Sequence, residues 1–407
     1  MTSRRLDREI ARVVDGGLCS GCGACCQLDP AVTMELDGEG YSRPCRSHPS
    51  ASTEREDRAL ARQFRSVCPG VVVRAPAPPG SVRHPTMGPA LGVWEAWAAD
   101  EDIRHRGSSG GVLTALAGWL VEEGEAAYVI GAGADADDPR RTVSVRIMSR
   151  DEALAASGSR YAPVSTAAAV GALDPAAAVV GKPCEASALR SLASARGGAE
   201  PLILSFFCAG TPSQHATDAL VGSLGAPVDT RLESLRYRGN GWPGDFTART
   251  TRGEQVTMSY DESWGRHLGP TVQWRCKVCV DGVGESSDVS AGDFWRTDAR
   301  GYPVFVEGAG VSALIARTPR GLDVVRRAVE AGVLVARPVD IDAIAAVQPL
   351  QRTRRETLLG RLVGAALAGR RSPRYRGFGL LGLALGRPRD AIRTARGTRA
   401  RVRRLSR

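Results

Sequence analysis

The chain has 407 residues, 43% of them hydrophobic, which allows a large buried core in two or three domains, or in one large domain with appendages. This composition excludes a disordered or collagen-like protein. The formal net charge of +10 is uneven, because residues 352–407 carry 17 arginines against two acids, a balance of +15 that leaves −5 for residues 1–351.

Whether the ten cysteines form disulfides or serve as ligands depends on the cellular compartment of the protein. The longest apolar stretches, at 112–121 and 378–386, are shorter than the roughly 20 residues of a membrane span. The N-terminus has no apolar core or cleavage site typical of a secretory signal. We therefore expect a cytoplasmic protein with no transmembrane segment, in which thiols stay reduced and serve as ligands rather than disulfides.

Residues 1–80 contain six of the cysteines, show little hydrophobic periodicity and end in a proline-rich hinge at 75–80. This pattern is typical of a small module held together by a cofactor. Cys19, Cys22 and Cys25 recur at every third residue in C-S-G-C-G-A-C-C, and the glycines let a tight loop turn three sulfurs inward.

The fourth ligand of this first set is less evident. Where a bacterial ferredoxin run has its fourth cysteine, followed by proline, this chain has Asp29. We expect Cys68, which a proline follows, to complete the set, with Cys26 or Cys45 as alternates. Zinc is the competing metal, but three cysteines at successive i+3 spacing suit a 4Fe–4S cluster better than the paired C-x2-C arms of a zinc site.

From residue 92 the pattern changes to strands that alternate with helices, which predicts an α/β body over 81–350. Helices are expected at 111–123, after 183, after 213 and at 321–332, and a hairpin at 246–260. Strands are expected at 126–133, 144–148, 176–181, 201–208 and 311–318.

Four further cysteines are scattered through this body: Cys184, Cys208, and Cys276 with Cys279 in C-K-V-C. Cys184 and Cys208 follow the ends of two predicted strands, and the carboxyl ends of neighbouring parallel strands lie at one edge of a sheet. However, a lone buried cysteine is usually a small apolar residue, and C-x2-C also occurs in zinc sites and redox dithiols. Spacing alone therefore indicates a four-thiolate site without fixing its metal.

Residues 351–407 are expected to form a basic helical tail with breaks at Pro373 and Pro388. Such a tail suits docking to nucleic acid, to an anionic membrane or to an acidic redox partner. The other interpretation is a solvated terminus, which the absence of a nucleic-acid-reading motif favours, and nucleic-acid binding is not expected. Deleting the tail should then leave cofactor content intact.

Beyond the N-terminal cysteine loop, six strings occur in a recognisable order: G-S-S-G-G-V-L-T-A-L (107–116), S-R-Y-A-P-V (159–164), V-G-K-P-C (180–184), F-F-C-A-G-T-P-S (206–213), C-K-V-C (276–279) and S-S-D-V-S-A-G-D-F-W (286–295). Over roughly residues 19–347 the chain resembles the beta-subunit family of coenzyme F420 hydrogenases and dehydrogenases. That family includes ferredoxin-dependent 7-hydroxymethyl chlorophyll a reductases and 8-vinyl reductases.

The resemblance implies that Cys184, Cys208, Cys276 and Cys279 ligate a 4Fe–4S cluster beside an FAD. It also implies a second 4Fe–4S cluster in the N-terminal module. That module departs from the family pattern, because it lacks the compact ferredoxin Cys-Pro, and Cys68 is therefore an inferred ligand. The expected architecture is a ferredoxin-like iron–sulfur module (1–80), a larger α/β flavin-binding body (81–350) and a basic helical tail (351–407).

The candidate flavin site is the turn at 107–111, because the helix after it offers free N–H groups to an anion. The turn is not a Rossmann fingerprint, and an ordinary glycine-rich helix cap is the alternative; the resemblance favours the FAD pyrophosphate. The expected cofactor-binding residues are Gly107, Ser108, Ser109, Gly110, Gly111, Arg160 and Tyr161. The catalytic candidates are His105, Tyr161 and Lys182, and Asp293 is either a functional carboxylate or a turn cap.

These features together predict an oxidoreductase that passes electrons between 4Fe–4S clusters, FAD and a small organic substrate or coenzyme F420. Clusters carry single electrons and organic reductions need pairs, so a flavin, which handles both, belongs between them. Ferredoxin or another redox partner is expected, and an oligomer is compatible with the sequence. The alternatives are a non-catalytic electron-transfer subunit of a larger complex, and a structural zinc protein with a nucleic-acid-binding tail.

Overall fold

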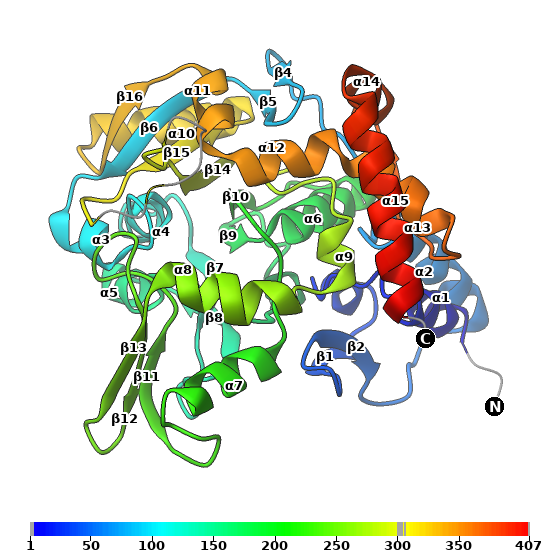
Figure 1. The fold of residues 1–407 in the computed structure, drawn as a ribbon, viewed down its shortest axis with the longest axis horizontal. Coiled ribbons are helices and arrows are strands. Elements are labelled where there is room, and N and C mark those ends of the chain that lie inside the picture. The colour runs from blue at the N-terminus through cyan, green and yellow to red at the C-terminus, as the bar shows by residue number, and fades with distance from the viewer. Residues whose placement is uncertain (1–3, 299–303, 305–306, 406–407) are drawn as a thin grey trace.

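Eight strands form the central sheet of the protein (Figure 1), in the order β16-β6-β15-β14-β10-β9-β7-β8. The computed structural model describes residues 4–298, 304 and 307–405. The inner strands β14, β10, β9 and β7 run parallel to one another, and the flanking strands are antiparallel to their neighbours. The bounds are β6 (Gly92–Ala98), β7 (Tyr128–Ala134), β8 (Thr142–Ile147), β9 (Ala177–Gly181), β10 (Leu202–Phe206), β14 (Val289–Asp293), β15 (Ser312–Ala316) and β16 (Leu334–Pro338).

Both faces of this sheet are covered, because side chains of the inner strands alternate between two cores. Ala178 and Leu204 belong to one core, and Val179 and Ile203 belong to the other. The helices that contribute to the first core are α3 (Glu101–Arg106), α4 (Val112–Glu122), α5 (Arg150–Ala155) and α10 (Pro319–Glu330). On the other face lies α6 (Pro183–Arg196), with the N-terminal helices outside it.

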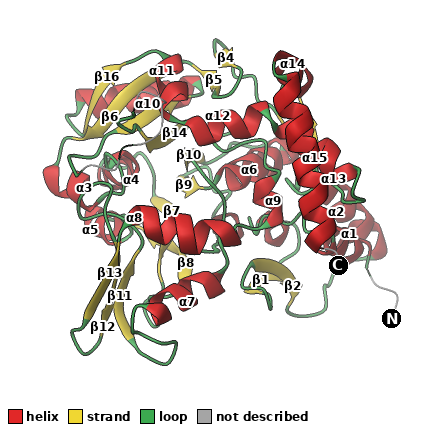
Figure 2. Ribbon diagram, viewed as in Figure 1, coloured by secondary structure: helices red, strands yellow, loops and turns green. Residues whose placement is uncertain are grey.

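A smaller antiparallel sheet stands beside the main one, with α7 and α8 against it (Figure 2). It contains the predicted hairpin, β12 and β13, with β11 as its third strand. The other predicted strands and helices of the body are likewise present within a few residues of their expected bounds, which confirms the mixed α/β prediction. The bounds here are α7 (Gln214–Ser223), β11 (Leu232–Arg236), β12 (Phe246–Thr250), β13 (Gln255–Met258) and α8 (Tyr260–Glu262).

The N-terminal module contains two amphipathic helices, α1 (Arg5–Asp15) and α2 (Glu54–Val67). On α1 the buried residues are Leu6, Ile10 and Val13, spaced four and three apart along one helical face. The expectation of little hydrophobic periodicity is therefore wrong for this helix. The apolar stripe was not predicted because charged residues outnumber apolar ones on α1 and the stripe contains only three buried residues.

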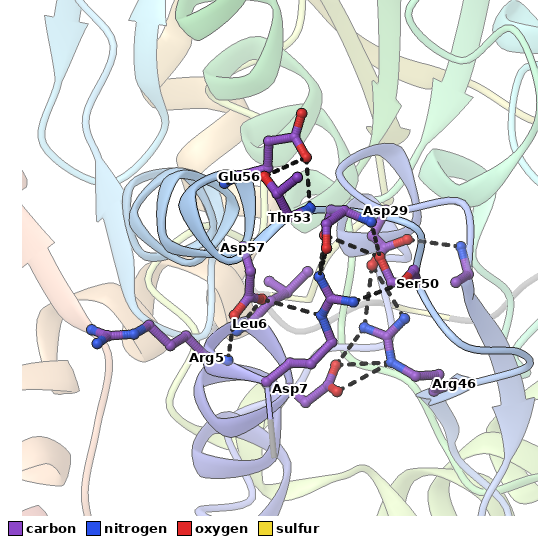
Figure 3. Close-up of polar contacts among 12 residues, drawn as sticks. Arg5, Leu6, Asp7, Asp29, Arg46, Ser50, Thr53, Glu56 and Asp57 are labelled. Carbon is purple, nitrogen blue, oxygen red and sulfur yellow. Dashed lines mark hydrogen bonds and ion pairs between the residues drawn. The ribbon is translucent and has the colours of Figure 1, made fainter. Parts of the chain in front are cut away.

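Polar side chains tie the start of α1 to the rest of the module (Figure 3). The carboxylate of Asp57, on α2, accepts hydrogen bonds from the backbone N–H groups of Arg5 at 2.8 Å and Leu6 at 3.2 Å, which are otherwise orphaned at a helix start. Arg46 Nε lies 3.1 Å from both carboxylate oxygens of Asp7. Because Arg46 ends the hairpin of β1 (Val32–Leu36) and β2 (Ser42–Arg46), these bonds fix the hairpin against α1.

The module also shares a core with the body. One apolar cluster contains Leu6 of α1, Phe64 of α2, Val179 of β9 and Leu189 of α6. The proline-rich segment that ends at residue 80 therefore does not separate two hydrophobic cores. The ferredoxin-like character of the module stays a prediction.

The C-terminal segment packs on the body instead of extending into solvent. Its strand β17 pairs in parallel with β3 (Val72–Arg74). Arg354 and Arg355 are 7% and 2% exposed, and Arg354 Nη2 donates to the carbonyl of Cys208 at 2.9 Å. The interpretation as a solvated terminus is thus wrong for the first half of the tail. Deleting the tail would remove contacts to the loop that contains Cys208. The elements are α12 (Pro349–Glu356), α13 (Leu358–Ala366), β17 (Arg374–Arg376), α14 (Leu380–Gly386) and α15 (Pro388–Leu405).

The remaining elements connect these layers, and they are η1 (Ala24–Gln27), β4 (Val82–His84), β5 (Gly88–Ala90), η2 (Thr166–Ala168), η3 (Ser263–Leu268), η4 (Gly269–Thr271), α9 (Trp274–Lys277) and α11 (Ile341–Val347). The expected breaks in the tail are confirmed, since Pro373 lies between α13 and β17 and Pro388 begins α15. Within the described part of the chain, we find no helix with the length and apolar character of a membrane span.

Candidate functional site

The first cysteine set surrounds one small cavity in the N-terminal module. Cys19, Cys22, Cys25 and Cys68 all line it, whereas Cys26 and Cys45 are not among its lining residues. Its other walls are mainly apolar side chains of α1 and α2: Ile10, Val13, Val14, Phe64 and Val67. The structure thus brings Cys68 to the three loop cysteines, as expected from the sequence.

Backbone geometry explains how the loop turns its sulfurs toward one point. Gly21 and Gly23 both adopt positive φ, at 71° and 83°, which a side chain would resist. A Cβ on Gly23 would also lie 2.6 Å from the Cβ of Ala168. The N–H of Gly21 donates to the sulfur of Cys19 at 3.4 Å. Cys68 reaches the cavity from the other side because it caps the end of α2.

The thiols of this set are buried, and that controls their protonation. Burial raises the pKa of Cys22 to about 11, and it also raises the pKa of Cys19 against the opposing effect of Arg43. For Cys68, burial raises the pKa first, and the nearby Cys22 and Cys19 raise it further. All ten cysteines are free thiols in the structure. Several buried thiols around one cavity fit a metal centre, because the positive charge of a metal is what allows such thiols to ionise.

Within the described ranges, no group of three or more His, Cys, Asp or Glu side chains converges on a position for a single metal ion. A zinc site joins four ligands to one ion, with its sulfurs about 2.3 Å away, whereas a 4Fe–4S cluster takes one thiolate on each of four irons.

The second cysteine set gathers at the carboxyl ends of β9 and β10, as expected. The two strands are parallel neighbours with Gly181 opposite Ser205, so Cys184, in the first turn of α6, and Cys208 leave the sheet at the same edge. Burial raises the pKa of Cys208, and the nearby Cys276 and Cys279 raise it further. Burial also raises the pKa of Cys184, partly offset by Lys182.

A buried arginine that sequence reasoning missed lies between the two sets. Arg275, beside Cys276 on α9, is 2% exposed and donates to the carbonyl of Pro69 at 2.9 Å, directly after Cys68. Its guanidinium interacts electrostatically with Cys184, Cys276 and Cys279 of the second set, and with Cys19 and Cys68 of the first. An arginine stays charged in proteins, so both sets share one fixed positive charge.

A cavity of about 580 Å³ opens at the same edge of the sheet as Cys208. This volume is typical of a site for an organic cofactor or substrate, and in α/β proteins such sites lie at the carboxyl ends of the strands. The sequence-predicted residues that line it are Gly107, Ser108, Ser109, Gly111, Arg160, Tyr161 and Lys182, together with Cys208 and Asp293.

The glycine turn joins α3 to α4 and presents the start of α4 to this cavity. Gly111, with φ of 74°, is the N-cap of α4, whose first N–H groups have no partner within the helix. Gly110 instead faces the sheet, where its N–H donates to Ser312 Oγ at 2.9 Å, and it does not line the cavity. His105 is exposed on α3 and also lies outside the cavity lining, so the structure does not bring it to the candidate site.

Two predicted residues have most of their polar atoms occupied within the protein. The guanidinium of Arg160 donates to the carbonyls of Leu235, Pro139 and Arg141 at 2.8–3.0 Å, so it ties β11 to the segment before β8. Lys182 is 5% exposed and its ammonium is bound by Val164 O and by the Glu185 carboxylate at 2.6 Å. Burial acts to lower the pKa of Lys182, but Glu185, Cys184 and Cys208 together outweigh it, so the net shift is upward.

An aromatic wall with a buried ion pair completes the cavity, and sequence reasoning found only part of it. Arg238 Nη1 and Nη2 lie 3.0 Å from the two carboxylate oxygens of Asp293, a bidentate pair. The guanidinium lies 4.5 Å from the ring centre of Tyr260 and 5.1 Å from that of Trp295. Tyr161 packs against Trp264 at 4.9 Å. Of these, Asp293 and Tyr161 were candidates; Arg238 carries no local sequence signal, because its partner is distant in the chain.

The glycine turn, the ligand-sized cavity and the two thiol sets on an α/β sheet together define a candidate redox protein. Two family models match the chain, and both describe the beta subunit of coenzyme F420 hydrogenase/dehydrogenase. The model of its N-terminal region matches residues 93–170, and the model of its C-terminal region matches residues 175–342. Together they cover more than half of the chain, which therefore belongs to the coenzyme F420 hydrogenase/dehydrogenase beta subunit family. Residues 1–92 and 343–407 lie outside both matched ranges.

Two individual proteins are similar to this chain. The coenzyme F420 hydrogenase subunit beta of Methanothermobacter thermautotrophicus is 25% identical over 260 residues, which span 60% of this chain and 83% of the relative. A chain in a structure of the F420-reducing [NiFe] hydrogenase complex from Methanosarcina barkeri is 22% identical, with a TM-score of 0.49, over 67% of this chain and 94% of that chain.

Proposed function

We propose that this chain is an iron–sulfur flavoprotein oxidoreductase that passes electrons between two 4Fe–4S clusters, FAD and an organic substrate or coenzyme F420. The observation that carries the proposal is the double position of Cys208, which belongs to the second thiol set and also lines the cavity beside the glycine turn. A cluster and an organic cofactor held there would be neighbours, as electron transfer between them requires.

Each of the two thiol sets would hold one of the two clusters. Iron binding would replace the protons that burial keeps on these thiols. The bound flavin would exchange single electrons with the clusters and electron pairs with the substrate. The proposed ligands are Cys19, Cys22, Cys25 and Cys68 for the first cluster, and Cys184, Cys208, Cys276 and Cys279 for the second.

The other residues have separate tasks in this proposal. The glycine turn and the N-terminus of α4 would receive the FAD pyrophosphate, because free N–H groups and the helix dipole favour an anion. Lys182 places the ammonium end of its buried ion pair with Glu185 between the second thiol set and the cavity. Tyr161 presents a hydroxyl to the cavity as a proton donor. The aromatic wall, held by the Arg238–Asp293 pair, shields the reacting groups from water.

Cofactor analysis of anaerobically reconstituted protein tests the proposal. We expect about eight iron and eight acid-labile sulfide per chain, as two 4Fe–4S clusters require, with one FAD. Cys208→Ser should lose about half of the iron, whereas Cys45→Ser, the matched control at a cysteine outside both sets, should keep all of it. Bound zinc without sulfide or flavin would contradict the proposal and favour the structural zinc protein.

The electron donor is decided by a second measurement. If reduced coenzyme F420 is the donor, mixing it with oxidised protein should bleach the flavin within seconds in a stopped-flow experiment. If ferredoxin is the donor, reduced ferredoxin should do so and reduced F420 should not.

The alternative function is that of a non-catalytic electron-transfer subunit, and the name of the Methanothermobacter relative favours it because that name describes one part of a hydrogenase. Turnover of an organic substrate by the purified chain, with a chemical reductant, would eliminate that alternative. A protein that binds clusters tightly, but that neither binds FAD nor turns over a substrate, would instead support the electron-transfer subunit.

A further inference from the structure

A wide groove of about 890 Å³ lies between α1, the chain that follows α2, and the end of α13. We call it the arginine groove. Its only acid among the described lining residues is already neutralised, because Glu9 Oε1 lies 2.8 Å from Arg12 and 3.0 Å from Arg65. The charged residues that line it are Glu9, Arg12, Arg370, Arg371 and Arg374.

Two of these arginines are available to a partner. Arg371 and Arg374 are exposed, and in the described part of the chain their side chains have no ion pair or hydrogen bond. Arg370 differs, because its guanidinium stacks 4.5 Å from the ring centre of Trp274. The groove also has apolar lining residues, among them Leu362 and Val363. Apolar area combined with charged residues is typical of a protein interface, and the positive charge selects an acidic partner.

The groove and the first cysteine cavity share part of one wall. Val13 lines both the groove and that cavity. Beside it, Leu18 directly precedes the ligand candidate Cys19. The wall is thin because Gly70 lies against it: a Cβ there would be 2.5 Å from Val13 Cγ1 and 2.7 Å from the carbonyl of Leu18. Electron transfer slows steeply with distance, so a redox centre held in the groove would be favourably placed.

We infer that the arginine groove docks an acidic protein that carries single electrons to or from the first cysteine set. This inference rests on the proposed function, since it requires a cluster at that set. Each encounter oxidises the carrier by one electron and reduces the cluster by one, or the reverse, so a two-electron conversion takes two encounters. Both segments that form the groove lie outside the ranges that the family models match, 93–170 and 175–342.

The test uses full-length reconstituted protein and a reduced, acidic bacterial ferredoxin as the probe. The double variant Arg371→Glu/Arg374→Glu should lower the second-order rate of electron transfer at least tenfold at low ionic strength. It should also remove most of the salt dependence, because steering by opposite charge is screened by salt. Iron and flavin content, and reduction by dithionite, should remain as in the unchanged protein.

The control is Arg252→Glu/Arg326→Glu, which changes the net charge equally. These two exposed arginines lie on the β12–β13 turn and on α10, away from the groove lining. The control should change the rate less than twofold. Equal rates for both double variants, or no reduction of the unchanged protein by ferredoxin, would overturn the inference while leaving the proposed function intact. Absence of clusters would overturn both.

An anionic membrane is the competing occupant of a basic groove. Sedimentation with vesicles that contain one quarter phosphatidylglycerol separates the two cases. If the groove variant loses vesicle binding but keeps its rate with ferredoxin, the groove is a membrane site and the inference is wrong.

Discussion

Replacing Arg355 by methionine should destabilise the loop that follows Cys279. The Glu285 side chain is fully buried, and two arginines hold its carboxylate: Arg83 Nη1 at 2.7 Å on Oε2 and Arg355 on Oε1. Arg355 Nε also donates to the carbonyl of Val280 at 2.8 Å, one residue after Cys279. The substitution would leave one buried carboxylate oxygen and one buried carbonyl without a partner.

The magnitude follows from burial. Removing one member of a buried ion pair costs about 3–5 kcal/mol, and because Arg83 remains, we expect the lower end, about 3 kcal/mol. The control Arg393→Met breaks an exposed pair with Asp390 and should cost less than about 1 kcal/mol. Urea unfolding of the apo protein, followed by circular dichroism, measures both.

A second substitution separates the charge from the packing. Glu285→Gln, added to Arg355→Met, replaces the half-paired carboxylate by a neutral amide whose oxygen can still accept a hydrogen bond from Arg83, and it should recover part of the loss. A loss of less than about 1 kcal/mol in Arg355→Met would refute the reasoning, and so would the absence of recovery in the double variant.

Three further predictions concern the cysteines, the shared charge and pH. Cys68→Ser should halve the iron content to about four per chain, whereas Cys26→Ser should retain about eight; equal iron in both variants would remove Cys68 as a ligand. Arg275→Met should shift the cluster potentials to more negative values in an EPR redox titration, because a positive charge that favours the added electron is lost, and Arg275→Lys should shift them less. Burial acts to raise the pKa of Asp288, but arginine partners, Arg320 among them at 2.7 Å, keep it below its usual value. A lowered pKa stabilises the fold above about pH 4, where the unfolded carboxyl is ionised, and this contribution is lost as pH falls through the folded pKa. The stability difference between the unchanged protein and Asp288→Asn should therefore narrow below about pH 4, and a constant difference would contradict the assignment.

The body of the fold could be predicted because its signals are local. Buried strands such as β9 and β10 are short apolar runs followed by helices, and this alternation specifies a parallel sheet. The same regularity placed Cys184 and Cys208 at one edge, since parallel strands end together. The first cysteine set was predictable from spacing, and Cys68 from the proline that follows it.

Residues that act through distant partners could not be predicted in this way. Arg238, Arg275 and Arg355 are 1–2% exposed, yet arginine in a sequence indicates a solvated surface. Each is buried only because a carboxylate or carbonyl far away in the chain meets it. The tail illustrates this: its arginine count predicted solvent, whereas Arg355 and Arg354 hold the loops of the second cysteine set.

The shared core of the N-terminal module and the body links the two cysteine sets structurally. The same apolar cluster joins α1 and α2 to α6, the helix whose first turn carries Cys184. Burial raises the pKa of Cys184, and Cys22 of the first set is among the thiols that raise it further, so the two sets lie within electrostatic reach. Removing residues 1–80 would therefore expose the apolar side of α6 and disturb a ligand of the second set. The module is thus a structural support for the second set as well as the candidate entry point for electrons, and losing it should affect both cysteine sets rather than one.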